Sequence, residues 1–222
     1  ANERRFTADA AHELRTPLAV VRIQAQVAQL SRNADDRQHA LQQILLGADR
    51  ATRVLEQLLR LARLDPLAGL PHPAEVDLAE LAERVLSDAR LAAADRCIVL
   101  ERSDDRLLIS GDAELLAIAL RNLLDNALRY TPPATTIRVI AARQDGEMTL
   151  GVIDDGPGVP PTELPRLVER FYRGSAARAE GSGLGLAIAQ RVADLHAARF
   201  ELENLPGGGF AAHLRWPRPP TA

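Results

Sequence analysis

Apolar residues recur every three or four positions through two long runs in the first third of the chain, residues 6–30 and 37–64. This spacing places them on one face of a helix and predicts two amphipathic helices. The short polar segment 31–36 lies between the runs, so we expect the helices to form an antiparallel hairpin.

The apolar stripe of the second run is too wide to be covered by one partner helix. Helices of about 25 residues are roughly 38 Å long, and a hairpin of that length cannot bury both of its stripes internally. A second hairpin would complete a four-helix bundle around one core. We therefore expect the segment to form a homodimer through this bundle. The stripe residues are Leu41, Ile44, Leu45, Ala48, Ala51, Leu55, Leu58, Leu59 and Ala62.

Beyond the helical runs, a segment dense in Pro and Gly marks a linker over residues 67–75. After it, apolar runs predict strands over 97–101, 136–142, 148–154, 200–204 and 210–216. Helical periodicity predicts helices over 78–94, 112–130 and 184–196. Interleaved elements of this kind predict an α/β sandwich over 76–218. The predicted fold class is therefore α+β, with a helical hairpin over 1–66 ahead of the sandwich.

Composition narrows the class of protein without identifying it. The chain has 222 residues, of which 46% are hydrophobic, and this excludes a disordered chain. No apolar stretch reaches the roughly 18 residues that span a bilayer, and a net charge of −3 gives no basic field for nucleic acid. The single cysteine, Cys97, cannot form an internal disulfide and fits a reducing compartment. The chain begins at Ala1 without Met, so we expect a piece of a longer protein.

His12 lies two residues before Leu14, about 200° around the helix from the apolar stripe, so we expect its side chain to face solvent. Glu13 can accept a proton from the imidazole, and Thr16 shares the face of His12 one turn later. Pro17 has no backbone N–H to donate inside the helix, so we expect a bend here. The cluster predicts a nucleophilic histidine, with an ordinary exposed histidine as the alternative. That ordinary reading is kept for the histidines without such neighbours, His39, His72, His196 and His213.

The helix predicted over 112–130 carries Asn122, Asn126, Arg129 and Tyr130 at positions i, i+4, i+7 and i+8. This spacing places two amides, a guanidinium and a phenol on one helix face. An amide oxygen is a hard ligand that suits Mg²⁺, and Arg pairs with phosphate. All 27 basic residues are Arg, so any cationic role must fall to Arg. The face suits a phosphorylated ligand, and a simply solvated helix face is the alternative.

Asp154, Gly156 and Gly158 end a predicted strand as an Asp-x-Gly-x-Gly motif. A carboxylate at this point can accept a hydrogen bond from an exocyclic amine. The two glycines let the backbone approach a flat ring closely. A strand-ending turn without ligand is the alternative, because Gly and Pro favour turns.

A second glycine motif, Gly181, Gly183 and Gly185, opens the last predicted helix. Backbone N–H groups at a helix N-terminus can cradle phosphates. The motif lacks the Gly-Lys-Ser/Thr of a Walker loop and has no strand directly before it, which argues against a dinucleotide fold. The segment 160–180 between the two glycine motifs is long, which is typical of a mobile lid.

The order of these features resembles the sensor histidine kinases of two-component systems, over essentially the whole chain. That order is a His-Glu pair on a helix, an Asn-rich helix, Asp-x-Gly-x-Gly, an aromatic arginine segment and Gly-x-Gly-x-Gly. Within the family, the QseC-like subgroup is most similar in residues 6–17, 24–30, 51–59 and 169–173. The resemblance implies a dimeric histidine phosphotransfer hairpin and an ATP-binding sandwich of the type shared with gyrase and heat-shock chaperones.

The resemblance also implies roles for single residues in the hairpin. His12 aligns with the phosphoacceptor, and Glu13 aligns with the acidic residue that acts as base in autophosphorylation. Thr16 aligns with the residue that positions water for dephosphorylating the partner. That partner is a response regulator, whose aspartate receives the phosphoryl group after docking near His12. A sensor and membrane spans would precede residue 1, making this the cytoplasmic portion of a bacterial inner-membrane protein.

In the sandwich, the Mg²⁺ ligand maps onto Asn126 with Asn122 beside it, and the adenine-recognising carboxylate maps onto Asp154. The usual Lys after the second Asn is Arg129 here, and a guanidinium can still bind phosphate. The family's loop glycines map onto Gly156, Gly158, Gly181, Gly183 and Gly185, and contacts to the γ-phosphate are expected from Arg170 and Arg173. The implied chemistry uses ATP and Mg²⁺: His12 attacks the γ-phosphorus and ADP leaves.

Two other functions remain open at this point. Another ATPase of the gyrase, heat-shock chaperone or mismatch-repair type would share the Asn, Asp-x-Gly and Gly-x-Gly features. It would not explain the hairpin with His12 displayed off the core stripe. A non-enzymatic dimerisation scaffold would need a degenerate nucleotide site, whereas all expected motif residues are present.

Overall fold

The computed structural model describes residues 2–63, 69–92, 96–103, 106–133, 135–144, 146–174 and 181–217. The chain divides into two compact units, Ala1–Arg63 and Leu64–Ala222, and each is considered by itself. Part of the linker expected over 67–75 lies outside the described residues, so its bounds stay a prediction. In the part of the chain that is described, no helix is long and apolar enough to cross a membrane.

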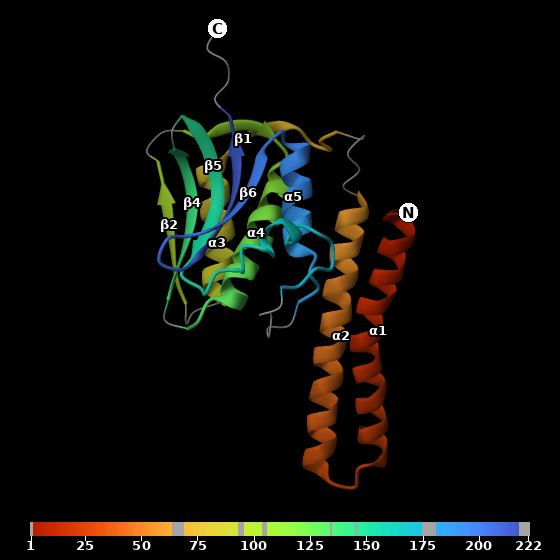
Figure 1. The fold of residues 1–222 in the computed structure, drawn as a ribbon. Helices are drawn as coiled ribbons and strands as arrows, with labels where there is room; N and C mark the ends of the chain where they lie inside the picture. The colour runs from red at the N-terminus through yellow and green to blue at the C-terminus, as the bar shows by residue number, and fades with distance from the viewer. Residues whose placement is uncertain are drawn as a thin grey trace. The chain divides into compact units, whose positions relative to one another are not determined.

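The first unit is the expected hairpin of two helices, α1 (Asn2–Leu30) and α2 (Ala34–Arg63) (Figure 1). Helix α2 begins three residues before the expected start at residue 37. Asn33 caps it, because its Oδ1 accepts the N–H of Asp35 at 2.9 Å. Asp35 and Asp36 in the first turn interact favourably with the helix dipole, so these polar residues extend the helix and do not form a loop.

The two helices of the hairpin approach closely at Gly47. A Cβ there would lie 2.7 Å from Cγ2 of Val21 and 3.4 Å from the carbonyl oxygen of Pro17. Helix α1 continues through Pro17, which is buried against this contact. The bend expected at Pro17 stays a prediction.

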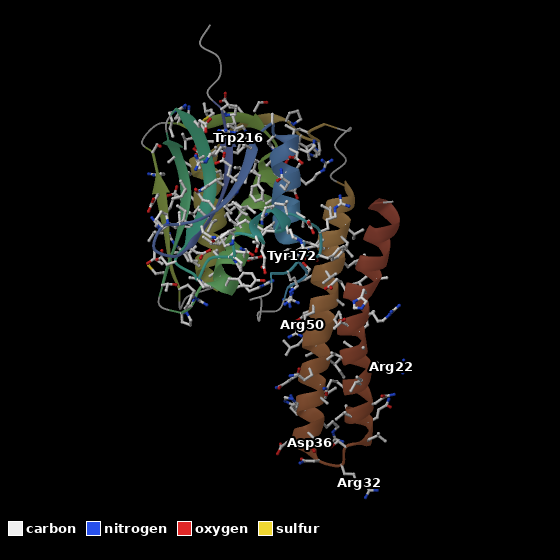
Figure 2. All side chains as sticks on the ribbon, viewed as in Figure 1. Arg22, Arg32, Asp36, Arg50, Tyr172 and Trp216 are labelled. Atoms are coloured by element: carbon white, nitrogen blue, oxygen red, sulfur yellow. The ribbon has the colours of Figure 1, made fainter. Side chains whose placement is uncertain are left out.

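Much of the apolar surface of the hairpin is not covered within one chain. Figure 2 shows charged side chains such as Arg22, Asp36 and Arg50 projecting away from the helices. Between them, large apolar side chains stay exposed at Leu18, Ile23, Val27, Leu30, Leu41, Leu45, Leu46, Leu55 and Leu59. Exposed apolar area of this extent is typical of an interface.

The second unit is an α/β sandwich, as expected. Its main sheet has the strand order β2-β4-β5-β7-β6, and only the β2–β4 pair is parallel. Helices α3, α4 and α5 cover one face of this sheet (Figure 1). The strands are β2 (Cys97–Arg102), β4 (Thr136–Gln144), β5 (Glu147–Asp154), β6 (Arg199–Asn204) and β7 (Phe210–Trp216), and the helices are α3 (Leu78–Ala92), α4 (Ala113–Tyr130) and α5 (Gly185–Leu195).

Three short elements were not expected from the sequence: β1 (Ala74–Asp77), β3 (Leu108–Gly111) and the 3₁₀ turn η1 (Leu164–Arg166). Strands β1 and β3 form a separate antiparallel pair. Four residues are too few for an alternating pattern to stand out, and these strands are fixed by pairing between distant segments.

Helix α4 carries four of the candidate nucleotide-binding residues, Asn122, Asn126, Arg129 and Tyr130, and its start is fixed by a buried cluster. Asp112 is the N-cap, and its side chain accepts the N–H groups of Glu114 and Leu115. The Asp112 N–H donates to Nε2 of His196 at 2.9 Å. His196 is 4% exposed and His213 is 3% exposed, so the expectation that both are exposed is wrong. Each packs inside the sandwich, and burial lowers the pKa of His196.

Candidate nucleotide site and candidate phosphoacceptor

In the hairpin, the structure places His12 on α1 with an exposed side chain, as expected. Glu13 beside it is half-buried, and Thr16 is exposed. The Thr16 hydroxyl donates to the backbone carbonyl of His12 at 3.5 Å, one turn earlier. Histidine, carboxylate and hydroxyl therefore lie within one turn of helix. The lone pairs of the Thr16 oxygen stay available to accept a hydrogen bond from water.

In the sandwich, the two asparagines of α4 differ in how their amides are used. Asn122 is 8% exposed, and its Nδ2 donates to the carbonyl oxygen of Ile118 at 2.8 Å. Asn126, one turn later, is half-buried. Among the described residues the Asn126 amide makes no hydrogen bond, so its oxygen is free to ligate a cation. The arrangement suits the expected division between a metal ligand at Asn126 and a neighbour at Asn122.

The end of α4 lies beside the second glycine motif. The guanidinium of Arg129 contacts Gly181, where a side chain would collide with Nη1. Arg129 is exposed, and Tyr130 is half-buried at the last position of the helix. Gly185 is the first residue of α5, so the motif opens a helix as expected. A cationic side chain and a helix N-terminus are thus brought to one region, which favours a phosphorylated ligand.

Asp154 ends β5 and is 5% exposed. Its Oδ1 accepts the N–H of Gly156 at 2.8 Å. Burial raises the pKa of the Asp154 carboxyl, the Gly156 N–H and the Thr131 hydroxyl lower it, and the charge of Asp155 raises it. The balance leaves the pKa above its ordinary value. A buried carboxylate with few donors around it is an acceptor for a ligand N–H group.

Thr131 belongs to this site, although the sequence pattern did not indicate it. Its side chain is 3% exposed and lies beside the Asp154 carboxylate. Within the described residues its hydroxyl has no hydrogen-bond partner of good geometry. A buried hydroxyl next to a buried carboxylate places two polar groups together at this site.

The turn that carries Thr131 is held from outside the helix by Arg96. Its Nη1 donates to the carbonyl oxygens of Thr131 and Pro132, both at 2.8 Å, and its Nη2 donates to that of Leu128 at 3.3 Å. A guanidinium at a helix C-terminus satisfies carbonyl groups that have no partner within the helix. Arg96 therefore fixes the end of α4 to the segment just before β2.

The first glycine motif is fixed by Asn204, the last residue of β6. The Asn204 side chain bonds the backbone N–H and carbonyl of Val159. Gly158 has a φ of +70°, a conformation that favours glycine, and a Cβ there would lie 2.8 Å from Oδ1 of Asn204. No local sequence signal connects Asn204 with this loop.

The segment before the second glycine motif is partly described. Phe171 donates its backbone N–H to the carbonyl of Gly183 at 2.9 Å, and the guanidinium of Arg166 lies 4.2 Å from the centre of the Tyr172 ring. Arg170 and Arg173 are exposed. Residues 175–180 of the expected lid lie outside the described residues, so its mobility stays a prediction.

Comparisons with known proteins match both units to families. Residues 2–67 match the His Kinase A (phospho-acceptor) domain. Residues 111–220 match the family described as histidine kinase-, DNA gyrase B-, and HSP90-like ATPase. The chain is 44% identical over 219 residues to the sensor protein QseC of Escherichia coli (strain K12), covering 96% of this chain and 47% of that protein. It thus spans about half the length of the curated relatives it matches.

Solved structures agree with this match. The cytoplasmic segment of histidine kinase QseC is 32% identical with a TM-score of 0.54, and the similarity covers 77% of this chain and 94% of that one. The mycobacterial sensor histidine kinase MprB is 31% identical with a TM-score of 0.59, covering 68% of this chain and 100% of that one.

Proposed function

This chain belongs to the sensor histidine kinase family, and from that premise we propose that it uses ATP to phosphorylate His12 and then passes the phosphoryl group to an aspartate of a response regulator. One observation carries the proposal. An exposed histidine beside an acid on a helical hairpin occurs in the same chain as a sandwich in which Asn122 lies against Gly185, Arg129 lies against Gly181 and Asp154 bonds Gly156. A scaffold with a degenerate nucleotide site would not retain both.

We propose that the residues around α4 bind the nucleotide. The Asp154 carboxylate accepts a hydrogen bond from the exocyclic amine of adenine, and Gly156 and Gly158 let the backbone lie close to the ring. Arg129 and the N-terminus of α5 at Gly185 face the phosphates. The remaining contacts of this set come from Asn122, Tyr130, Gly181, Gly183, Arg170 and Arg173.

The Asn126 amide oxygen fits Mg²⁺, because it is a hard oxygen donor that no described residue occupies. When bound, Mg²⁺ would neutralise negative charge on the triphosphate. The chain's own part in the reaction lies at His12. An imidazole nitrogen forms a bond to the γ-phosphorus, the bond from that phosphorus to the β,γ-bridging oxygen breaks, and ADP leaves. Glu13 accepts the proton from the imidazole.

We propose that the same hairpin also dephosphorylates the response regulator and forms the dimer. Thr16 holds a water whose oxygen bonds to the phosphorus of the docked regulator's phosphoaspartate. The bond from that phosphorus to the aspartate oxygen breaks, and inorganic phosphate leaves. The exposed apolar residues of α1 and α2 pack against a second copy in a four-helix bundle, in line with the family's dimerisation domain.

The proposed domains are 1–66 for dimerisation and phosphotransfer, 67–75 for the linker and 76–218 for nucleotide binding. Together they form the cytoplasmic portion of a bacterial inner-membrane sensor.

Incubation with γ-labelled ATP and Mg²⁺ tests the proposal. The chain should acquire an acid-labile, base-stable label, as a phosphohistidine does, and His12→Gln should acquire none while keeping ATP affinity and its dimeric state. ATP hydrolysis without a stable label would favour an ATPase of the gyrase or chaperone type. Label retained on His12→Gln would overturn the assignment of the phosphoacceptor.

A further inference from the structure

The side-chain amide of Asn204 pairs with the backbone of Val159 on both sides. Its Oδ1 accepts the N–H of Val159 at 2.8 Å, and its Nδ2 donates to the carbonyl oxygen of Val159 at 2.6 Å. The two residues are 45 positions apart in the chain. The side-chain amide thus satisfies the backbone N–H and C=O of Val159, as a neighbouring strand would do within a sheet.

The loop needs such a replacement because β5 ends at Asp154. Beyond that residue the sheet no longer fixes the backbone. One end of the loop is held by the hydrogen bond between Gly156 and Asp154, at 2.8 Å. The other end is held by Asn204, which also lies against Gly158. A Cβ on Gly158 would meet the Asn204 Oδ1 at 2.8 Å and the carbonyl oxygen of Gly209 at 3.3 Å, so the loop is closely packed on this side.

We infer that Asn204 is a positioning residue of the nucleotide site, which holds the Asp154–Val159 loop in its binding conformation before the ligand arrives. The inference rests on the proposed function. Both polar atoms of the Asn204 amide are bonded to Val159, so its effect on a ligand is exerted through this loop. Without it, the loop must be ordered at the moment of binding, and that cost weakens affinity.

The inference separates binding from phosphoryl transfer. His12 and Asn126, which act at the phosphates, lie on other elements, so a bound nucleotide still meets an intact reacting centre. Loss of Asn204 should therefore raise KM and leave kcat close to its normal value. A residue that only supports the fold would lower the melting temperature and change both parameters.

The test compares Asn204→Ala, Asn204→Asp and wild type in the whole 222-residue chain. Asn204→Asp keeps an acceptor for the Val159 N–H but places a second oxygen against the Val159 carbonyl. The control is Gln190→Ala, which removes an exposed amide that bonds Asp194 on α5. Calorimetric titration with Mg²⁺–ADP gives the affinity, thermal melting without ligand gives the stability, and autophosphorylation at varied ATP gives KM and kcat.

Both Asn204 variants should bind Mg²⁺–ADP about tenfold more weakly than wild type and Gln190→Ala, with kcat within twofold. Equal affinity in variant and wild type overturns the inference and leaves the proposed function intact. A fall in kcat together with a lowered melting temperature also overturns it, in favour of a purely structural role. If the wild-type chain itself binds no nucleotide, that result overturns the proposed function, and the inference about Asn204 falls with it. Where Asn204→Ala does not fold, Asn204→Asp decides by the same criteria.

Discussion

The side-chain oxygen of Asn122 lies 3.2 Å from the position that a Cβ on Gly185 would occupy. Helix α4 therefore contacts the first residue of α5 through the Asn122 amide, which lies close to the Gly185 backbone. This contact brings the asparagine face of α4 to the start of α5. It also separates the roles of the motif's glycines. At Gly185 a Cβ would be in tight contact with the Asn122 side chain, whereas Gly183 has a φ of +68°, a backbone conformation that favours glycine.

Gly183→Ala should therefore be more damaging than Gly185→Ala. At position 183 the strained φ adds to a Cβ contact of 2.6 Å with the Phe171 backbone, which cannot move as a flexible side chain could. At position 185 the amide needs to yield by only a few tenths of an ångström. We expect Gly183→Ala to lower the melting temperature by several degrees, corresponding to about 1–3 kcal/mol. Gly185→Ala should melt close to wild type. Equal melting temperatures would contradict the described backbone of this loop.

Asn126→Ala should separate metal binding from folding. The Asn126 amide makes no hydrogen bond within the described residues, so the variant should melt close to wild type. Its autophosphorylation should fall strongly across a Mg²⁺ titration, because the proposed protein ligand of the metal is absent. Asn122→Ala is the matched control: it loses the bond to Ile118 and should lower the melting temperature. Normal Mg²⁺ dependence in Asn126→Ala would remove Asn126 from the site.

Asp154→Asn should weaken ATP binding and yet stabilise the protein without ligand. The lost charged hydrogen bond to adenine corresponds to about 1–3 kcal/mol of affinity. The stability effect follows from the raised pKa of Asp154, whose first cause is burial. Because the folded carboxyl holds its proton more tightly than the unfolded one, this group makes the protein less stable as pH rises from 3.8 through the folded pKa.

The neutral amide does not carry this cost. At pH 7 the unliganded Asp154→Asn chain should melt at or above the wild-type temperature, and the difference should vanish as pH falls below 3.8. Calorimetric melting at several pH values, with nucleotide titration of the same samples, measures both effects. Unchanged ATP affinity would remove Asp154 from the adenine site, and a variant that is less stable at pH 7 would contradict the electrostatic argument.

Sequence periodicity was sufficient for the elements whose information is local. The periodicity predicts the bounds of α4 to within one residue, because its apolar stripe is long. The prediction that Asp154 ends a strand is confirmed, and the signal is the glycine and proline that come two and three residues after it. The pattern predicts a start of α2 that is three residues late, because Asp35 and Asp36 suit a polar turn as well as the first turn of a helix.

Three contacts that the sequence pattern does not reveal join distant segments of the chain. Arg96 holds the turn at Thr131, and Asn204 holds the loop at Val159, across 35 and 45 positions respectively. Neither has a neighbour or a spacing that marks it, because a side chain that bonds backbone carbonyls or N–H groups needs no particular partner residue. The buried state of His196 was missed for the same reason: its partner is the backbone N–H of Asp112.

Thr16→Ala tests whether the hairpin acts on the regulator as well as on ATP. The Thr16 hydroxyl donates only one long, exposed bond, 3.5 Å to the carbonyl of His12, so its removal should change the melting temperature little. Autophosphorylation does not need a water held by Thr16, because His12 itself is the nucleophile. We therefore expect Thr16→Ala to keep autophosphorylation and transfer but to lose dephosphorylation of the phosphoregulator, a loss on the order of tenfold or more.

The alternative interpretation is that Thr16 only supports the helix before Pro17. In that case both activities should fall together with thermal stability. Following the decay of the phosphoregulator with wild type and variant, alongside their melting curves, separates the two. Equal decay rates would end the phosphatase role of Thr16 and leave the kinase assignment of His12 untouched.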